Sequence, residues 1–334
     1  MSSLFDSLTE QERGSLRRAA QPKWIEPMKA MLTDERFSDP NWIFERKLDG
    51  VRCLAYRTPG RVRLLSRTAK DLNHAYPELA EALDRERRED FVVDGEIVAF
   101  RRGVTSFERL QHRMQVADPD RARRSGVPVF LYVFDVVHLE GHDTRALPQR
   151  TRKALLRKAL SFHGPIRYMQ HRNTEGEALY REACKRGLEG LIAKRADSIY
   201  TSRRSNNWLK FKCSHEQELV IGGFTDPQGT RTEFGALLVG YFEDGDLRYA
   251  GKVGTGFDRP TLGRLGKRLR ELERDDPPFV DVHPIPPRTH WVEPRLVGQF
   301  GFTEWTRDGR LRHPRYLGLR DDKRPREVVR ERPA

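Results

Sequence analysis

Short apolar stretches on either side of Lys47 predict two strands separated by a tight turn. Residues 42–44 are apolar, Asp49-Gly50 is a pair typical of two-residue turns, and residues 51–56 are again mostly apolar. A lysine at the edge of such a turn would be held between two strands, and burial or neighbouring cations would lower its pKa and make its amine a nucleophile. Lys-x-Asp-Gly arises by chance in roughly one chain in ten of this length, and a solvated lysine beside a hairpin is the alternative. The assignment therefore depends on partners elsewhere in the chain.

The other apolar patterns up to residue 214 alternate between strand and helix types. Residues 129–139 form a nearly unbroken apolar run, which is typical of a buried central strand. Residues 91–100 predict a second strand, turn and strand, with Asp94-Gly95 at the turn. Further strands are predicted at 61–67, 166–171, 190–194 and 208–212, and helices at 77–88, 106–114, 149–162 and 175–186. This mixture predicts an α+β domain over residues 1–214.

From residue 216 onward the pattern changes to short strands separated by Gly and Asp. Strands are predicted at 218–224, 235–242, 247–253 and 291–306, with one helix at 260–274 and a proline-rich connection at 277–287. Several short strands with one interrupting helix are typical of a small barrel of the OB type. We therefore expect a second domain over residues 215–334, ending in a basic tail.

Composition narrows the class of partner and the compartment. The chain of 334 residues has a formal net charge of +13, which favours a polyanion, most simply nucleic acid, through counterion release. An anionic membrane surface competes, but no lipidation motif or basic amphipathic helix stands out. No apolar run reaches the roughly 18 residues of a membrane span, and the polar N-terminus is unlike a secretory signal. The 3 cysteines form no CxxC motif, so we expect a reducing, cytoplasmic compartment and no structural zinc.

Charged residues of several predicted strands could join Lys47 in a nucleotide site. Asp94-Gly95-Glu96 and Glu189-Gly190 place carboxylates at strand ends, where they could hold Mg²⁺ beside substrate phosphates. Lys210 and Lys212 alternate on one strand, so both point to one face and could neutralise charge at a transferring phosphorus. The chain has no GxxxxGK[ST] phosphate loop. Its absence strengthens the case for a covalent lysine.

The order of these motifs resembles that of ATP-dependent DNA ligases of the covalent lysyl-nucleotidyltransferase superfamily, in particular the ligase module of bacterial end-joining ligases. The stretches that carry the likeness, in family order, are 47–52, 66–67, 94–96, 134–135, 189–194, 209–212 and 312–323. The resemblance implies an α+β nucleotidyltransferase (ATP-grasp-like adenylation) domain followed by an all-β OB-fold barrel domain. It covers nearly the whole chain.

The resemblance also implies a role for each matching residue. Lys47 would attack the α-phosphate of ATP, expel pyrophosphate and hold AMP, with Lys210 and Lys212 as further catalytic residues. AMP would then pass to a DNA 5′-phosphate, which Arg67 meets at the nick, before the 3′-hydroxyl attacks. Glu189 would bind the catalytic Mg²⁺, with Glu96 as a second ligand and Mn²⁺ as the alternative ion. The implied ATP contacts are Glu45 with the adenine amino group, Arg52 and Glu96 with the ribose, Phe134 stacked on adenine, Arg67, Lys194, Lys210 and Lys212 with AMP or phosphate, and Arg312, Arg320 and Lys323 with pyrophosphate.

Several alternatives stay open at this point. An RNA ligase or a GTP-using capping enzyme has the same chemistry, although Glu45 suits adenine better than guanine. A non-catalytic nucleic-acid-binding protein would need none of the lysines. Without the resemblance, Phe134 would be ordinary core, and Glu96 and Glu189 would be members of weak surface ion pairs. The expected partners are nicked or broken duplex DNA and, in trans, end-binding and end-processing repair proteins; we expect a monomer that associates with the nucleoid when bound to DNA.

Overall fold

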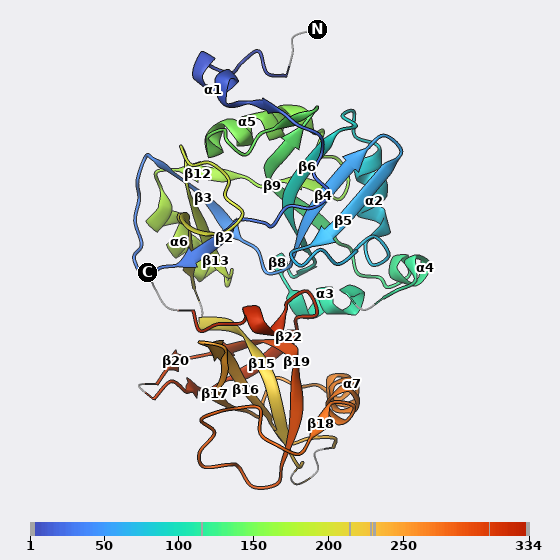
Figure 1. The fold of residues 1–334 in the computed structure, drawn as a ribbon, viewed down its shortest axis with the longest axis vertical. Coiled ribbons are helices and arrows are strands. Elements are labelled where there is room, and N and C mark those ends of the chain that lie inside the picture. The colour runs from blue at the N-terminus through green and yellow to red at the C-terminus, as the bar shows by residue number, and fades with distance from the viewer. Residues whose placement is uncertain are drawn as a thin grey trace. The chain divides into compact units, whose positions relative to one another are not determined.

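The computed structural model describes residues 4–114, 116–213, 215–227, 229, 232–306 and 308–331. The chain divides into two compact units, Met1–Cys213 and Ser214–Glu331 (Figure 1). No helix in these described ranges is both long enough and apolar enough to cross a membrane. The two units are described separately below.

The larger sheet of the first unit contains Arg52, Glu96 and Phe134, three of the predicted site residues. Its strands are β1 (Arg17–Arg18), β4 (Val51–Thr58), β5 (Arg61–Ser66), β6 (Phe91–Val98), β9 (Phe130–Leu139), β10 (His142–Asp143) and β11 (Ile166–Tyr168). They are ordered β1-β10-β9-β6-β4-β5, and β11 pairs in parallel with β9. Helices α2 (Pro77–Asp84) and α5 (Gln149–Ala159) bury apolar side chains in one core with Val93 and Val133. Strand β9 is buried along most of its length, so the predicted central strand is confirmed.

The second sheet of this unit has the order β12-β3-β13-β14-β2. Its strands are β2 (Lys29–Leu32), β3 (Trp42–Lys47), β12 (His171–Asn173), β13 (Gly190–Arg195) and β14 (Arg204–Lys212). Helix α6 (Gly176–Lys185) packs on it, and Leu179 and Ala183 join Phe44, Leu191 and Phe211 in one apolar cluster. The remaining elements of the unit are α1 (Glu10–Ser15), α3 (Phe107–Met114), α4 (Pro119–Arg123), β7 (Phe100–Arg101) and β8 (Val104–Thr105).

The chain passes from one sheet to the other immediately after Lys47. Strand β3 ends at Lys47 and β4 begins at Val51, and the two strands belong to different sheets. The prediction of two strands joined by a short connection is therefore right, but the interpretation that they form a hairpin is wrong. Each strand finds its neighbours far away in the sequence instead.

The predicted turn at Asp94-Gly95 is also wrong, because β6 runs unbroken from Phe91 to Val98. The register between β6 and β9 shifts between Asp94 and Gly95. A Cβ atom on Gly95 would lie 2.7 Å from the carbonyl oxygen of Tyr132. The glycine thus permits a close approach of two strands at an irregularity, which is its other common use within sheets.

The second unit is mostly β-structure with a single longer helix among its described residues. Its main sheet has the order β17-β16-β15-β19-β18, with β22 paired to β19. The elements are β15 (His215–Thr225), β16 (Leu237–Glu243), β17 (Asp246–Val253), α7 (Arg259–Arg270), β18 (Glu273–Arg274), β19 (Thr289–Phe302), β20 (Glu304–Trp305), β21 (Leu311–Arg312), β22 (Arg315–Leu319) and the 3-10 helix η1 (Pro325–Glu327). The Asp258 carboxylate caps α7 by accepting from the Thr261 N–H at 2.8 Å. This curled antiparallel arrangement with one helix agrees with the predicted all-β barrel domain.

A disulfide joins Cys184 at the end of α6 to Cys213 just after β14. Cys53 is the free, buried cysteine. The wide sequence spacing of the cysteines did not predict this pairing. The cross-link holds the end of β14, and hence Lys212, against α6.

Candidate active site

Antiparallel pairing of β3, β13 and β14 arranges the predicted residues in two neighbouring rows. Lys47 lies opposite Gly190, which lies opposite Lys212. In the next row, Glu45 and Lys210 lie opposite the same residue of β13. Residues opposite one another, or two apart on a strand, share a face of the sheet. The structure therefore gathers the predicted nucleophile, the predicted base-binding carboxylate and both predicted phosphate-binding lysines on one face.

Lys47 is paired with Glu189, the residue that precedes β13. Its ammonium donates a hydrogen bond to the Glu189 carboxylate, and the Lys47 side chain is only 21% exposed. Burial works to lower the pKa of Lys47, but the Glu189 carboxylate raises it above its ordinary value, with smaller contributions from Asp49 and Glu96. The expectation of a lowered pKa is therefore wrong for the free protein. It rested on burial or neighbouring cations, whereas the neighbouring charges are carboxylates, whose combined effect on the pKa exceeds that of burial.

The second oxygen of Glu189 is available for another interaction. Oε2 is buried and has no hydrogen-bond partner among the described residues. A carboxylate oxygen in this condition suits a hard divalent cation, which prefers oxygen ligands. No group of three or more His, Cys, Asp or Glu side chains forms a closed metal site in the described ranges. Glu189 thus fits a cation that is completed by substrate phosphate and water, as is usual for Mg²⁺.

Glu45 is buried between two lysines. Lys153 of α5 donates a hydrogen bond to Oε1, and Lys194 Nζ lies 2.7 Å from Oε2. Burial works to raise the pKa of Glu45, but the charges of Lys153 and Lys194 hold it below its ordinary value. For Lys194, burial and the charge of Lys153 lower the pKa to about 8, despite the opposing effect of Glu45. The carboxylate is therefore ionised and can only accept hydrogen bonds.

Arg52 of β4 is held by Asp94 of β6. The guanidinium donates to both carboxylate oxygens, and the Tyr200 hydroxyl donates to Asp94 at 2.7 Å while it accepts from the Met28 N–H at 2.9 Å. Glu96 lies directly opposite Arg52 in the β4–β6 register. The predicted ribose-binding pair is therefore together in the structure. It lies on the sheet that the chain enters at β4, directly after the connection that follows Lys47.

Phe134 of β9 is buried, as ordinary core would be, but its neighbours are charged. The guanidinium of Arg52 lies 4.7 Å from its ring centroid, and Lys194 Nζ lies 4.2 Å from it. Trp208 of β14 packs edge-on at 6.0 Å. Cations over an aromatic face are held by the ring quadrupole. The ring that was predicted to stack on adenine is thus in contact with two other predicted site residues.

The remaining predicted residues lie outside this face. Arg67 follows β5, the edge strand of the larger sheet. Arg312, Arg320 and Lys323 belong to the second unit, where they pair with Glu304 at 2.7 Å, Asp322 at 2.9 Å and Glu218 at 2.8 Å, respectively. Arg320 is buried. Their predicted contacts with substrate remain predictions.

Sequence reasoning missed several residues of the site, notably Lys153, Tyr200 and Trp208. It considered Asp94 as a possible Mg²⁺ ligand and did not foresee its pairing with Arg52. Helical periodicity could have revealed Lys153, because positions 152, 153, 156 and 159 fall on one side of α5, and basic residues are rare on a buried stripe. Both basic residues of that stripe are buried: Arg152 pairs with Asp135, and Lys153 pairs with Glu45. Tyr200 and Trp208 carried no local signal.

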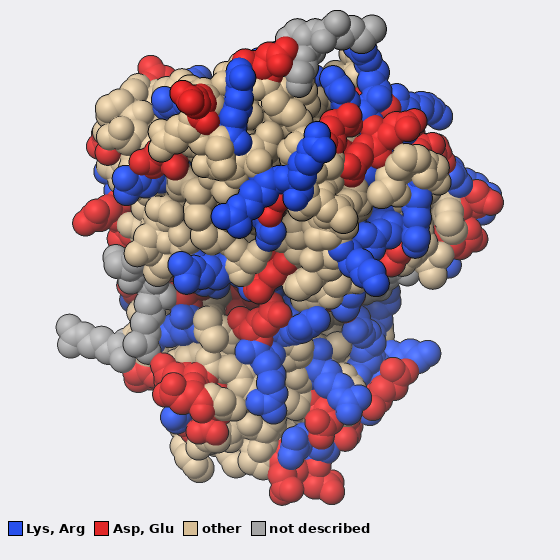
Figure 2. Space-filling model, turned by 45° about the horizontal axis from the view of Figure 1, so that its top comes forward, with Lys and Arg blue, Asp and Glu red and all other residues tan. Residues whose placement is uncertain are grey.

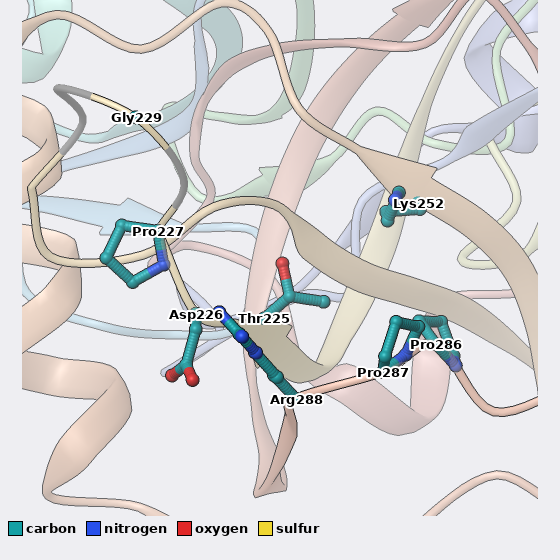
Figure 3. Close-up of a pocket in the computed structure, with 8 residues that line it drawn as sticks. All are labelled: Thr225, Asp226, Pro227, Gly229, Lys252, Pro286, Pro287 and Arg288. Atoms are coloured by element: carbon teal, nitrogen blue, oxygen red, sulfur yellow. The ribbon is translucent and has the colours of Figure 1, made fainter.

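A pocket of about 520 Å³ lies in the second unit (Figure 3). It is lined by Thr225, Asp226, Pro227, Gly229, Lys252, Pro286, Pro287 and Arg288. None of these is a predicted site residue. Asp226 is already paired with His290 at 2.8 Å. The candidate site is therefore the charged face of the first unit and not this pocket.

Comparison with known proteins relates both parts of the chain to one family. The family model described as "ATP dependent DNA ligase domain" matches residues 26–212, and "ATP dependent DNA ligase C terminal region" matches residues 230–323. The multifunctional non-homologous end joining protein LigD of Pseudomonas aeruginosa is 36% identical over 325 residues, which is 95% of this chain and 38% of that protein. A DNA ligase of Thermococcus fumicolans is 32% identical over 304 residues, covering 85% of this chain and 53% of that protein.

A solved structure gives the same relationship. It is entitled "mycobacterial DNA ligase D complexed with ATP and MES", is 35% identical and has a TM-score of 0.64, covering 92% of this chain and 98% of that one. The chain spans about two fifths of the length of the first curated relatives, at 38% and 37% of them.

Proposed function

Since the chain belongs to the ATP-dependent DNA ligase family, we propose that it seals breaks in duplex DNA that carry a 5′-phosphate and a 3′-hydroxyl. This membership confirms the family resemblance and the two-domain fold inferred from the motifs. The observation that carries the proposed activity is the row of Lys47, Gly190 and Lys212 beside Glu189. An amine nucleophile, a carboxylate and parallel lysines on one sheet face form a site for transferring a nucleotidyl group.

In the first step, the Lys47 amine attacks the α-phosphate of ATP, a nitrogen–phosphorus bond forms, and the bond to pyrophosphate breaks. The amine must first lose its proton and leave Glu189, because the ion pair keeps Lys47 protonated in the free protein. Glu189 and Glu96 would hold Mg²⁺ or Mn²⁺, which supplies charge neutralisation at the phosphates when bound. Lys210 and Lys212, on the same face, stabilise the charge that develops on the transferring group.

The adenosine of ATP binds where the two sheets of the first unit meet. Glu45 accepts a hydrogen bond from the adenine amino group, Arg52 and Glu96 bind the ribose, and Phe134 stacks on the base. Adenine would take the place of one of the cationic groups, Arg52 or Lys194, that contact the Phe134 ring in the free protein. The second unit supplies Arg312, Arg320 and Lys323, which orient pyrophosphate.

The two later steps need DNA. Arg67 binds the 5′-phosphate that receives AMP, and the 3′-hydroxyl then attacks this adenylated end. The net charge of +13 supports binding to the phosphate backbone. On the face drawn in Figure 2, Lys and Arg side chains occur in many places, interspersed with Asp and Glu. Contacts of lysines and arginines with phosphates would hold the duplex without reading its sequence. Relatives named for non-homologous end joining support a role in that repair, in the cytoplasm, as a monomer with end-binding and end-processing proteins in trans.

Labelling with α-labelled ATP and Mg²⁺, followed by a denaturing gel, tests the proposed function. We expect a protein-linked label that pyrophosphate removes and that Lys47→Ala abolishes. Lys185→Ala, at an exposed lysine of α6, is the matched control and should label normally. Labelling of Lys47→Ala would contradict the proposal. Nicked duplexes with DNA or RNA at the break then distinguish a DNA ligase from an RNA ligase.

A further inference from the structure

Lys153 is a buried lysine that lies outside every motif used above. It belongs to α5, and its side chain is 2% exposed. Its ammonium donates to the Glu45 carboxylate and to the carbonyl oxygen of Met169 at 2.9 Å, and it lies 4.6 Å from the centroid of the Tyr168 ring. Lys153 thus contacts Glu45, a carboxylate on the same sheet face as Lys47, although it lies 108 residues further along the chain.

Stability alone does not explain this buried pair. Taking two charges out of water costs about as much as their attraction returns, so an apolar pair of similar volume is usually as stable. Glu45 also has a second cationic partner in Lys194. The neighbouring buried pair of Arg152 and Asp135 differs in its partner, because Asp135 is not one of the predicted site residues, whereas Glu45 is.

The charge of Glu45 decides which base it can accept. An ionised carboxylate only accepts hydrogen bonds, whereas a protonated one also donates. Adenine carries an amino group, a donor, at the position where guanine carries an oxo group, an acceptor. An ionised Glu45 therefore binds adenine and repels guanine, and a protonated Glu45 loses this distinction. A site whose polar groups match one ligand leaves them unpaired with another, which is a strong source of specificity.

We propose that Lys153 is a positioning residue that holds Glu45 ionised and in place, and so sets the preference of the site for adenine over guanine nucleotides. This rests on the proposed function, since it assumes that Glu45 meets the base. Lys194 lies on the same face and over the Phe134 ring on which the base would stack, whereas Lys153 comes from α5 and is also held by the Met169 carbonyl oxygen. Lys153 thus remains as the fixed counter-charge.

The test compares label transfer from α-labelled ATP and GTP, with rate and KM determined separately for each. For Lys153→Met we expect the ratio of rate/KM for ATP over GTP to fall by about tenfold, through the KM for ATP. Lys153→Arg, which keeps the charge, should restore the ratio to within about twofold. Lys158→Met makes the same change on the exposed side of α5, where Lys158 binds Ser7, and should leave the ratio unchanged.

The possible outcomes separate this inference from the proposed function. A folded Lys153→Met protein with the wild-type ratio overturns the inference, as does a wild type that uses both nucleotides equally. If Lys153→Met does not fold, Lys153→Gln carries the same expectation, because it keeps a donor and removes the charge. A wild type that takes no label from ATP overturns the proposed function itself, and the inference with it.

Discussion

Lys47 at the end of β3 and Glu189 just before β13 form an ion pair across two adjacent strands. The pair keeps the amine protonated, so the free protein holds its nucleophile in an unreactive state. The other oxygen of the same carboxylate is buried without a hydrogen-bond partner among the described residues. A cation that binds this oxygen would weaken the pull of Glu189 on the Lys47 proton, so Glu189 couples cation binding to the protonation of Lys47.

Glu189→Gln should separate the reactivity of Lys47 from its catalytic use. Loss of the carboxylate lowers the pKa of Lys47, because the charge that raises it is gone. We expect faster acylation of Lys47 by an amine-reactive reagent, measured by mass spectrometry with Lys185 as the internal reference. We expect labelling by ATP to slow by at least about 100-fold, because a group that stabilises the transferring phosphate is lost. Slower acylation of Lys47 would contradict the pairing.

Lys194 predicts a dependence of stability on alkaline pH. Burial and the charge of Lys153 lower its pKa to about 8 in the folded protein, below the ordinary 10.5, against the opposing effect of Glu45. Between these values the unfolded chain binds more protons than the folded one, so raising the pH stabilises the folded state. Relative to Lys194→Met, the wild type should gain about 2–3 kcal/mol in free energy of unfolding between about pH 7.5 and 10.5.

Urea unfolding followed by tryptophan fluorescence measures this difference at each pH. The comparison with Lys194→Met cancels the titration of lysines and tyrosines elsewhere in the chain. Glu45, Lys153 and Asp135, the charged groups that act on Lys194 in the wild type, are present in both proteins. A constant difference across this pH range would show that Lys194 titrates at its ordinary value.

Tyr200→Phe should affect both stability and ATP binding. The hydroxyl is buried, donates to Asp94 and accepts from the Met28 N–H. Its loss leaves a buried N–H unpaired, which costs about 1–3 kcal/mol. It also removes one of the groups that orient the carboxylate of Asp94, and hence Arg52, so the KM for ATP should rise several-fold with a smaller change in rate. Tyr241→Phe, in the second unit, is the control; equal kinetic effects in both variants would refute the role of Tyr200.

The sequence predicted those features of the site that depend on neighbouring residues, and it did not predict contacts between residues far apart in the chain. Strands β9, β13 and β14 were predictable because apolar and alternating patterns are local. The pairing of Lys47 with Glu189 was not, because strand order decides it, and the Asp-Gly motif suggested a hairpin that the chain does not form. Asp94-Gly95 shows the same limit, since a glycine that permits close strand approach has the same local pattern as one in a turn. The helical pattern of α5 could have marked Lys153 as buried, but its partner Glu45, 108 residues away, could not be read from that pattern.

The Cys184–Cys213 disulfide predicts a specific thiol count. The denatured, unreduced protein should show one reactive thiol per chain, from Cys53, and three after reduction. Because the cross-link closes a loop with a sequence separation of 29, reduction should lower the free energy of unfolding by about 3–4 kcal/mol in the chain-entropy model. Cys184→Ser should be insensitive to reductant. Three reactive thiols without reduction would show that Cys184 and Cys213 are not bonded. A reducing compartment, as expected from the sequence, favours that state.

Gly190 lies in the row between Lys47 and Lys212, and its backbone leaves no room for a side chain. Its φ is +139°, and a Cβ atom there would lie 1.9 Å from the carbonyl oxygen of Phe211 on β14. Gly190→Ala must therefore push β13 and β14 apart. We expect a loss of more than about 2 kcal/mol in free energy of unfolding and a fall in labelling by ATP of about 100-fold, since small displacements at a reacting centre have effects of this size.

Gly187→Ala is the control that separates this clash from backbone strain. Gly187 also has a positive φ, +68°, but an added Cβ would have no heavy atom within 4 Å. It should cost only about 1–2 kcal/mol and leave labelling close to that of the wild type. If the two variants lose activity equally, the cause is the strain of placing a side chain at a positive φ, which both share. The close contact with Phe211 of β14, which only Gly190→Ala makes, is then not the cause. If only Gly190→Ala loses activity, the spacing of β13 and β14, which sets the separation of Lys47 from Lys212, is what nucleotidyl transfer requires.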